Sequence, residues 1–281
     1  MPRLSPDGRL LATAISSGDG TDLWVYDSQR DAMSRLTFGG ANYGYPVWSP
    51  DGRFLVFYGA GLGGLYWMRA DGASAPQQLT RSQNPQFPWS FSPDGKRLAF
   101  ADLTMSGGDI WTVTIENDGG VLKAGRPEPF LQTSANEIYP AFSPDGRWIA
   151  YRTFESGTSE IQVRAFPDKG GKWLISNGGG VVPVWSPNGR ELFYRSEDQH
   201  IMVVSYTVKD DVFVADKPRR WADRTLAESQ ARNLDITPDG KRFVTMMPVD
   251  APVEPRAQSQ VIFLQNFADE LQRRAPSAAA R

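Results

Sequence analysis

Six short runs in the chain place a hydroxyl two residues before a carboxylate or an amide. The first is Ser5-Pro6-Asp7-Gly8. A serine beside a carboxylate could belong to a nucleophilic catalytic site, and a glycine-containing loop could hold an anion with its backbone N–H groups. The same order of residues also fits a type I turn, with proline in the second position and a left-handed glycine in the fourth. The other five runs begin at Ser49, Ser92, Ser143, Ser186 and Thr237.

The repetition favours the turn over the chemistry. One active site needs one such loop, whereas a structural corner is needed once in every repeat. In the fifth run Asn188 replaces the aspartate, and an amide makes the same local backbone hydrogen bond without acting as a carboxylate. We therefore interpret the six runs as hairpin turns.

The rest of the chain offers few groups for catalysis or metal binding. There is no cysteine, the one histidine is His200, and no G-x-S-x-G motif is present. These features disfavour thiol chemistry, zinc or iron sites and a Ser-His-Asp triad. The candidate calcium ligands lack the spacing of a calcium-binding loop; they are Asp19, Asp22, Asp27, Asp210 and Asp211. We predict no catalytic residue, no metal and no cofactor.

The spacing of the turns predicts the elements around them. The turn carboxylates, and the amide of Asn188, recur every 43 to 51 residues, which is the period of a four-stranded propeller blade. A short strand leads into each turn and a second strand leads out of it, with a large apolar residue in register, as at Leu55 and Ile149. A polar hairpin then leads to a third strand, and a fourth closes the repeat, as at Leu36-Thr37. The sequence predicts an all-β, six-bladed β-propeller of four-stranded antiparallel blades.

The propeller is expected to occupy residues 1–267, with an incomplete last blade. Its third strand is predicted at Val261-Ile262-Phe263-Leu264, and no fourth strand is visible. Residues 268–281 are expected to form a short helix and a disordered tail. Because an open sheet edge invites pairing, we expect either a strand upstream in a longer protein or the C-terminal helix to cover it.

The composition limits the classes of partner. The 30 lysines and arginines nearly balance 32 aspartates and glutamates, so no overall field would attract nucleic acid or an anionic membrane. There is no apolar run of about 18 residues, and the sequence from Met1 enters the first repeat directly without a signal peptide. We expect a monomer with no membrane span and no nucleic-acid partner, and the composition leaves the compartment open.

The repeats resemble those of TolB-type propellers. In both, an aromatic residue precedes S-P-D-G-[RK], and an I-[WY]-V strand and a closing L-T follow. The resemblance covers nearly the whole chain. Because such propellers occur in TolB, in peptidases of the prolyl oligopeptidase family and in bacterial signalling proteins, it implies the fold more than the function.

The second half also resembles the propeller found C-terminal to bacterial Ser/Thr protein kinases. That resemblance implies a sensor or interaction module and favours an extracytoplasmic or periplasmic location. The chain departs from the pattern at Gln162, Ala165 and Phe267, and it contains no kinase motif. The resembling stretches are residues 136–140, 155–167, 170–176, 189–195 and 266–271.

The candidate ligand site lies on one face of the predicted ring. The loops that join neighbouring blades share this face with the loops between the second and third strands, and ligands commonly bind there. Arg152 and Arg195 end two second strands at the same register. They could receive a peptide terminus or another acidic ligand, or they could pair with glutamates of the rim, namely Glu137, Glu155 or Glu197. The predicted ligand-binding residues are Tyr43, Gln86, Glu137, Tyr139, Arg152, Arg195 and Arg232.

The sequence thus predicts a non-enzymatic propeller that recognises a protein or peptide, as the sensor or scaffold part of a larger bacterial signalling protein. Two alternatives stay open. One is a hydrolase or lyase that uses carboxylates at the axial funnel, although oligogalacturonate lyases, which are also propellers, hold a metal with several histidines. The other is a stand-alone periplasmic TolB-like envelope protein.

Overall fold

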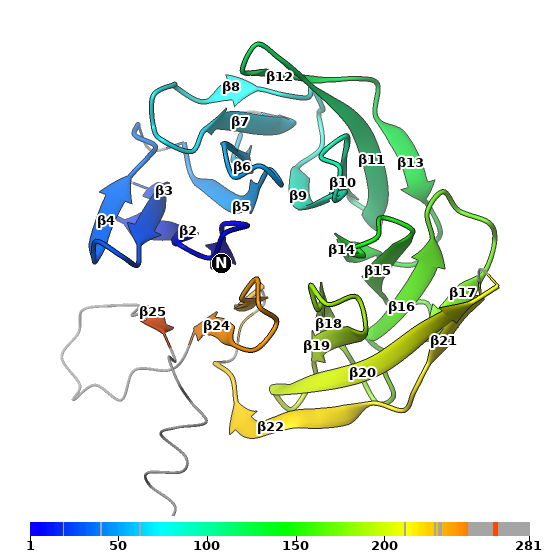
Figure 1. The fold of residues 1–281 in the computed structure, drawn as a ribbon. Coiled ribbons are helices and arrows are strands. Elements are labelled where there is room, and N and C mark those ends of the chain that lie inside the picture. The colour runs from blue at the N-terminus through cyan, green and yellow to red at the C-terminus, as the bar shows by residue number, and fades with distance from the viewer. Residues whose placement is uncertain are drawn as a thin grey trace, which may run out of the picture.

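A computed structural model of the protein describes residues 1–246, apart from residues 19, 40, 62, 211, 228, 230 and 231, together with the backbone of residues 261–263. The described strands form six antiparallel sheets arranged around a central axis (Figure 1). No helix occurs in this part of the chain. The all-β propeller predicted from the repeats is confirmed, and the predicted C-terminal helix lies outside the described residues.

Each sheet is built from consecutive strands. The first contains β1 (Arg3–Leu4), β2 (Leu10–Ser17), β3 (Gly20–Asp27) and β4 (Ala32–Arg35), and the second contains β5 (Tyr43–Trp48), β6 (Phe54–Gly59), β7 (Leu65–Arg69) and β8 (Gln77–Gln78). The third contains β9 (Gln86–Phe91), β10 (Arg97–Thr104), β11 (Gly107–Asp118), β12 (Val121–Ala124) and β13 (Glu128–Leu131). The fourth contains β14 (Ile138–Phe142), β15 (Trp148–Thr153), β16 (Glu160–Ala165) and β17 (Lys172–Leu174). The fifth contains β18 (Val181–Trp185), β19 (Glu191–Arg195), β20 (His200–Lys209), β21 (Val212–Ala215) and β22 (Arg219–Thr225), and the sixth contains β23 (Leu234–Ile236), β24 (Phe243–Met246) and β25 (Val261–Phe263).

The third and fifth sheets have a fifth strand that the sequence did not predict. In each, the third strand is long, and its second half pairs with an added strand before the closing strand pairs with its first half. The added strands are β12 and β21. They account for the two longer intervals of 51 residues between successive turns, because an extra hairpin needs about eight more residues.

The six S-P-D-G-type runs are turns, as predicted. Their glycines have φ between 67° and 71°, the left-handed region that glycine enters without steric cost. In the fourth turn the N–H of Gly146 donates to the carbonyl of Ser143 at 2.9 Å. The Ser143 hydroxyl donates to Oδ1 of Asp145 at 2.5 Å and accepts from the N–H of Trp148 at 3.0 Å. Serine and aspartate therefore bond to each other and to the turn, which gives the pair a structural role.

The turns also close the ring. A Cβ at Gly52 would lie 3.7 Å from Pro6 of the preceding turn, and a Cβ at Gly8 would lie 2.8 Å from Pro238 of the sixth. The N–H of Leu4 donates to Oδ2 of Asp235 at 2.9 Å. First and sixth sheets thus meet as the other neighbours do (Figure 1).

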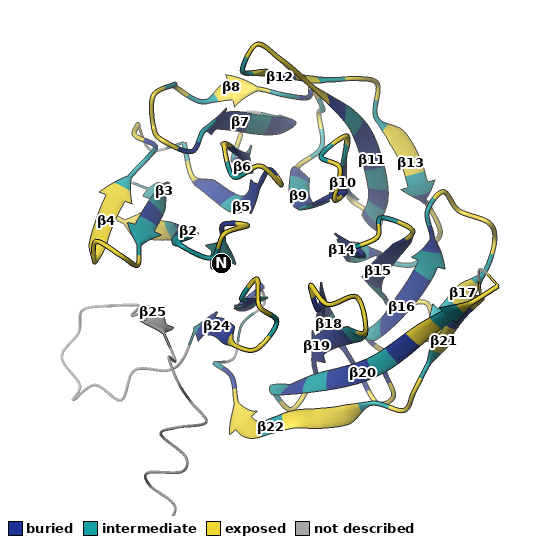
Figure 2. Ribbon diagram, viewed as in Figure 1, coloured by how far each residue is buried: buried dark blue, intermediate teal, exposed yellow. Residues whose placement is uncertain are grey.

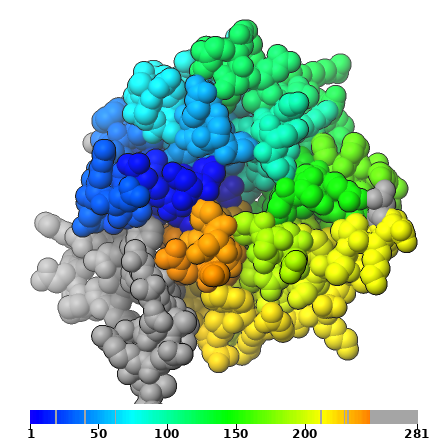
Figure 3. Space-filling view, viewed as in Figure 1, coloured from blue at the N-terminus to red at the C-terminus, as the bar shows by residue number. Residues whose placement is uncertain are grey.

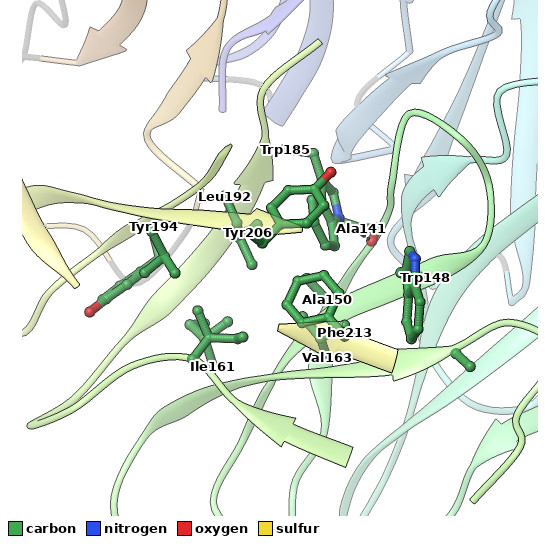
Figure 4. Close-up of a cluster of buried hydrophobic side chains, with 13 residues drawn as sticks. Ala141, Trp148, Ala150, Ile161, Val163, Trp185, Leu192, Tyr194, Tyr206 and Phe213 are labelled. Atoms are coloured by element: carbon green, nitrogen blue, oxygen red, sulfur yellow. Dashed lines mark hydrogen bonds between the residues drawn. The ribbon is translucent and has the colours of Figure 1, made fainter. Parts of the chain in front are cut away.

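Burial falls from the inner strands to the outer ones (Figure 2). Between the fourth and fifth sheets, aromatic side chains gather around Phe213, which β21 inserts into the interface (Figure 4). Its ring centroid lies 5.2 Å from Trp148 and 4.8 Å from Tyr206. Trp48, Trp67 and Trp185 are also buried and belong to the hydrophobic clusters of the ring.

Two equivalent serines give a test of the turn assignment. Ser143 and Ser186 are both fully buried, but the Ser186 hydroxyl has no hydrogen-bond partner. We expect Ser143→Ala to lower the free energy of unfolding by about 1–3 kcal/mol, because it leaves the Trp148 N–H unsatisfied. Ser186→Ala should change it little. Urea unfolding of both variants checks this, and equal losses would contradict the role given to the Ser143 hydroxyl.

Candidate functional site

Arg152 and Arg195 occupy equivalent places in two neighbouring sheets. Each lies at the end of a second strand and faces the first residue of the inner strand, with Arg152 opposite Ile138 and Arg195 opposite Val181. Arg152 is half-buried, and Arg195 is only 5% exposed. The repeat therefore brings two cationic side chains to the same rim of the ring.

The contacts of the two arginines involve neutral groups. Arg195 donates from Nη1 to Oδ1 of Asn233 at 2.9 Å and from Nη2 to the carbonyl of Ser229 at 2.7 Å, while its Nε has no partner. Arg152 donates from Nε to the Ser159 hydroxyl at 2.8 Å. Its guanidinium carbon lies 4.3 Å from the centroid of the Phe154 ring.

The alternative prediction, that glutamates of the rim neutralise these arginines, is wrong for the residues that the structure describes. Within this part of the chain no carboxylate forms an ion pair with Arg152 or Arg195. Glu155 instead pairs with Lys172 at 2.6 Å. The physical reason is reach: Arg152 bonds to Tyr139 of the inner strand, whereas Glu155 bonds to Gln162 and Lys172 of the two outer strands.

Arg152 and Arg195 form a cluster of positive charge at this rim that no neighbouring carboxylate of the described residues neutralises. Burial lowers the pKa of Arg152 and of Arg195, and the charge on Arg152 lowers the pKa of Arg195 further. Burial raises the pKa of Tyr139, while both arginines act to lower it. Tyr139 also hydrogen-bonds to Arg152. Arg152, Arg195 and Tyr139, three of the predicted ligand residues, are therefore brought together, and an anion at this rim would be stabilised.

A cluster of aromatic side chains that the sequence did not predict lies beside these arginines. It consists of Tyr45, Tyr58, Phe87 and Trp89 and is called the aromatic plug below. Tyr45 lies 4.5 Å from Phe87 and 5.6 Å from Trp89, and Trp89 lies 4.4 Å from Tyr139 (centroid distances). Tyr45, Tyr139 and Val182 each have φ between 55° and 61° at a bulge of the inner strand. Each precedes a proline, which is the repeated signal that could have revealed these axis-lining positions.

Three other predicted ligand residues lie away from this rim cluster. Tyr43 is buried in the core, with its ring edge-on to Phe57 at 5.4 Å. Gln86 is buried, accepting from the Thr80 hydroxyl at 2.6 Å and donating to Asp102 at 2.8 Å. Arg232 pairs with Asp235 at 2.7 Å and lines a cavity on the axis. A loop position alone does not tell whether a side chain points outward or between blades.

Glu137, another predicted ligand residue, is also buried by the fold. It is 2% exposed and accepts from the Thr133 hydroxyl at 2.5 Å, while its Oε2 has no partner. Burial raises the pKa of this carboxyl group above its usual value. An ionised Glu137 therefore destabilises the folded state at neutral pH.

The shift predicts an unusual pH dependence for Glu137→Gln. The pKa of Glu137 is higher in the folded state than in the unfolded state, so ionised Glu137 destabilises the folded state at pH 7. This destabilisation disappears as the pH falls through the folded-state pKa to below the unfolded-state pKa. We expect the variant to unfold at a higher Tm than the parent at pH 7, and the gap to close by about pH 4. A lower Tm at pH 7 would contradict this. Thermal melts across this range supply the measurement.

The one histidine lies in a local cluster with a serine and an aspartate, but not in the order of a catalytic triad. The Ser196 hydroxyl donates to Asp198 at 2.5 Å, and Nδ1 of His200 lies 3.0 Å from the other oxygen of Asp198. In a triad the imidazole stands between the serine and the carboxylate. Here the aspartate is in the middle, so the serine has no general base.

The described residues contain no group of three or more histidine, cysteine, aspartate or glutamate side chains arranged to hold a metal ion. They also contain no helix long and apolar enough to cross a membrane.

No protein-family model matches the chain. An uncharacterized peptidase of Bacillus subtilis, YuxL, is 28% identical over 159 residues, which cover 53% of this chain and 21% of YuxL. The Tol-Pal system protein TolB of Francisella tularensis is 26% identical over 233 residues, which cover 67% of this chain and 51% of TolB. The chain therefore spans about a fifth to a half of the length of these relatives.

Two solved structures have a similar fold. TolB from Acinetobacter baumannii superposes with a TM-score of 0.62 at 15% identity, covering 87% of this chain and 59% of that one. An oligogalacturonate lyase in complex with manganese superposes with a TM-score of 0.59 at 14% identity, covering 87% and 84%. Identity at this level establishes the fold and not the function. This chain has the fold of a β-propeller, and it is similar to TolB in sequence and in structure.

Proposed function

We propose that the propeller recognises a carboxylate-bearing segment of a protein or peptide through Arg152 and Arg195. The observation that carries the proposal is a pair of guanidinium groups, one of them buried, that no carboxylate of the described chain neutralises. Buried cations are ordinarily paired. Arginine also suits this ligand, because its planar fork matches a carboxylate with two parallel hydrogen bonds.

The aromatic plug supports a peptide over a free ion. Tyr58 and Phe87 stack with centroids 4.6 Å apart, and Tyr45 packs against both rings. These residues belong to the second and third sheets, while the arginines belong to the fourth and fifth. A segment with a carboxylate and an apolar side chain would meet a complementary surface on each side of the axis.

In the whole protein this recognition would serve as a sensor or scaffold, without catalysis by the propeller itself. The similarity to TolB supports a role in binding a protein partner, and the resemblance to kinase-linked propellers supports a module within a larger signalling protein. Both roles would place the partner on the face of the ring that carries Arg152 and Arg195.

A binding assay tests the proposal. A fluorescent library of hexapeptides with free C-termini is compared with the same library amidated at the C-terminus, in the presence of the full chain. We expect binding of the free acids only, weakened about ten- to a hundred-fold by Arg152→Met, because a charge-assisted hydrogen bond is lost. Arg126→Met, on an exposed loop, is the matched control. Equal binding of both libraries, or no effect of Arg152→Met, would sink the proposal.

Glu137 supports a second candidate function, a hydrolase or lyase. A buried carboxyl group with a raised pKa and a free oxygen has the properties of a general acid. Its test is turnover of ester, peptide and glycoside substrates. Reproducible turnover that is lost in Glu137→Gln would establish catalysis over simple recognition.

A further inference from the structure

A second site lies on the axis at the opposite face, where the six turns meet. The structure has a cavity of about 420 Å³ there, lined by residues of all six sheets. Cavities of this size hold small-molecule ligands in many proteins. Figure 3 shows how closely the turns gather around the axis on this face. The apolar wall includes Pro6, Pro50, Pro93, Pro144, Pro187 and Trp48.

The charged groups of the cavity carry an excess of positive charge. Arg3, Arg232 and Asp235 all line it. Both oxygens of Asp235 are occupied, Oδ1 by Nη2 of Arg232 at 2.7 Å and Oδ2 by the N–H of Leu4 at 2.9 Å. Arg3 donates from Nη2 to the carbonyl of Trp89 at 2.6 Å. One carboxylate thus faces two guanidinium groups, and Arg3 has no ion pair among the described residues.

The environment of Arg3 disfavours its positive charge. Burial holds the pKa of Arg3 well below its usual range, and the neighbouring charge of Arg232 lowers it further, while Asp235 raises it. An anion beside Arg3 would favour the charged form of the guanidinium and so oppose both of these effects.

Trp89 provides an independent indication of a ligand. Trp89 is 5% exposed and is one of the residues that line the cavity, and its indole Nε1 has no hydrogen-bond partner. Trp48 and Trp185, which line the same cavity, donate their Nε1–H groups to backbone carbonyls of Arg3 and Ala141, each at 2.8 Å. A buried donor without an acceptor is costly, so the free Nε1–H of Trp89 is suited to an acceptor atom that a ligand brings.

We propose that this axial cavity binds a small monocarboxylate with a flat apolar body, held by Arg3 and by the Nε1–H of Trp89. One net positive charge selects a monoanion, and the indole N–H donates to one of its carboxylate oxygens. The proline rings and Trp48 contact the apolar body.

The cavity is separate from the rim that carries the proposed recognition function. Arg152 and Arg195 do not line it. Trp89 belongs to both the cavity wall and the aromatic plug, and its contact with Tyr139 places the plug between the two sites. Either site can therefore be present without the other.

Phenylacetate and its neutral analogue phenylacetamide are the probes, titrated into the full chain by calorimetry and by ¹H–¹⁵N spectra of the nine tryptophan indoles. The Trp89 signal is assigned by its absence in Trp89→Phe. We expect saturable binding of phenylacetate that shifts this signal, and about ten-fold weaker binding of phenylacetamide. Arg3→Gln should weaken phenylacetate binding about ten- to a hundred-fold, and Trp89→Phe several-fold. Arg126→Met, on an exposed loop away from both sites, is the matched control and should bind as the parent does.

Several results would overturn the proposal. They are no saturable binding of phenylacetate, equal affinity for acid and amide, or a shift of other indoles without that of Trp89. If Arg3→Gln does not fold, Trp89→Phe and the acid-to-amide comparison still decide the outcome. A loss of binding in Arg152→Met alone would move the ligand to the rim.

Discussion

Replacing Trp148 by alanine is expected to lower the free energy of unfolding by about 3–5 kcal/mol, the usual cost of removing a large aromatic side chain from a packed core. Trp148 is 2% exposed and contacts Trp173 and Phe213 with centroids 5.3 and 5.2 Å away. These rings come from the fourth and fifth sheets, so the cavity would open in the interface between them (Figure 4). Urea unfolding followed by circular dichroism supplies the measurement.

The control for this prediction is Trp148→Phe. The Nε1–H of Trp148 is buried without a partner, so phenylalanine removes an unsatisfied donor and keeps most of the ring. We expect a clearly smaller loss than with alanine, because the two effects oppose each other. Equal losses in both variants would mean that a phenyl ring keeps none of the packing of the indole, which would contradict the prediction.

Gly64→Ala is the second change with a large expected effect, about 2–5 kcal/mol. Gly64 has φ of 80°, where a Cβ costs about 1–2 kcal/mol. That Cβ would also lie 2.2 Å from the carbonyl oxygen of Thr80, and such an overlap costs about 1–3 kcal/mol more. Thr80 accepts from the N–H of Leu65 at 2.9 Å and donates to Gln86. Displacing it therefore disturbs the hydrogen bonds that join the second and third sheets.

Gly61→Ala is matched to this variant. Gly61 has φ of 73° and lies in the same loop, but a Cβ there would meet no atom within 4 Å. Only the backbone cost of about 1–2 kcal/mol applies to it. If the two variants lose the same stability in urea unfolding, the overlap with Thr80 is relieved by a small shift of the loop, and the prediction for Gly64 is wrong.

Much of the fold could be predicted from the sequence, because its determinants are local. A turn such as Ser143 to Gly146 needs a residue with positive φ and hydrogen bonds within six positions of the chain, and both are visible in the residue types. Repetition of that turn at the length of four strands then fixes the blade. The closing strand predicted at Leu36-Thr37 was placed slightly too late, because β4 ends at Arg35. The extra hairpins of β12 and β21 were missed because the repeat predicts only what its copies share.

The candidate sites could be predicted only in part. The shared register of Arg152 and Arg195 gave their common rim, since equivalent positions in neighbouring repeats lie side by side. The fates of Gln86 and Glu137 could not be predicted, because a polar loop residue either faces solvent or turns between two blades. Arg232 likewise lies in a loop but lines the axial cavity.

The sequence by itself therefore determined the turns, the strand order and the ring, since each follows from interactions within one repeat. The tertiary structure alone decided which charges are left uncompensated. Arg195 bonds to Asn233 and Ser229 of the loop that leads into the sixth sheet. Arg3 bonds to Trp89 of the third sheet and lies near Asp235 of the sixth. These partners are 34 to 232 positions apart in the chain. Closure of the ring brings these residues together. A local pattern of residue types cannot predict contacts between positions so far apart in the chain.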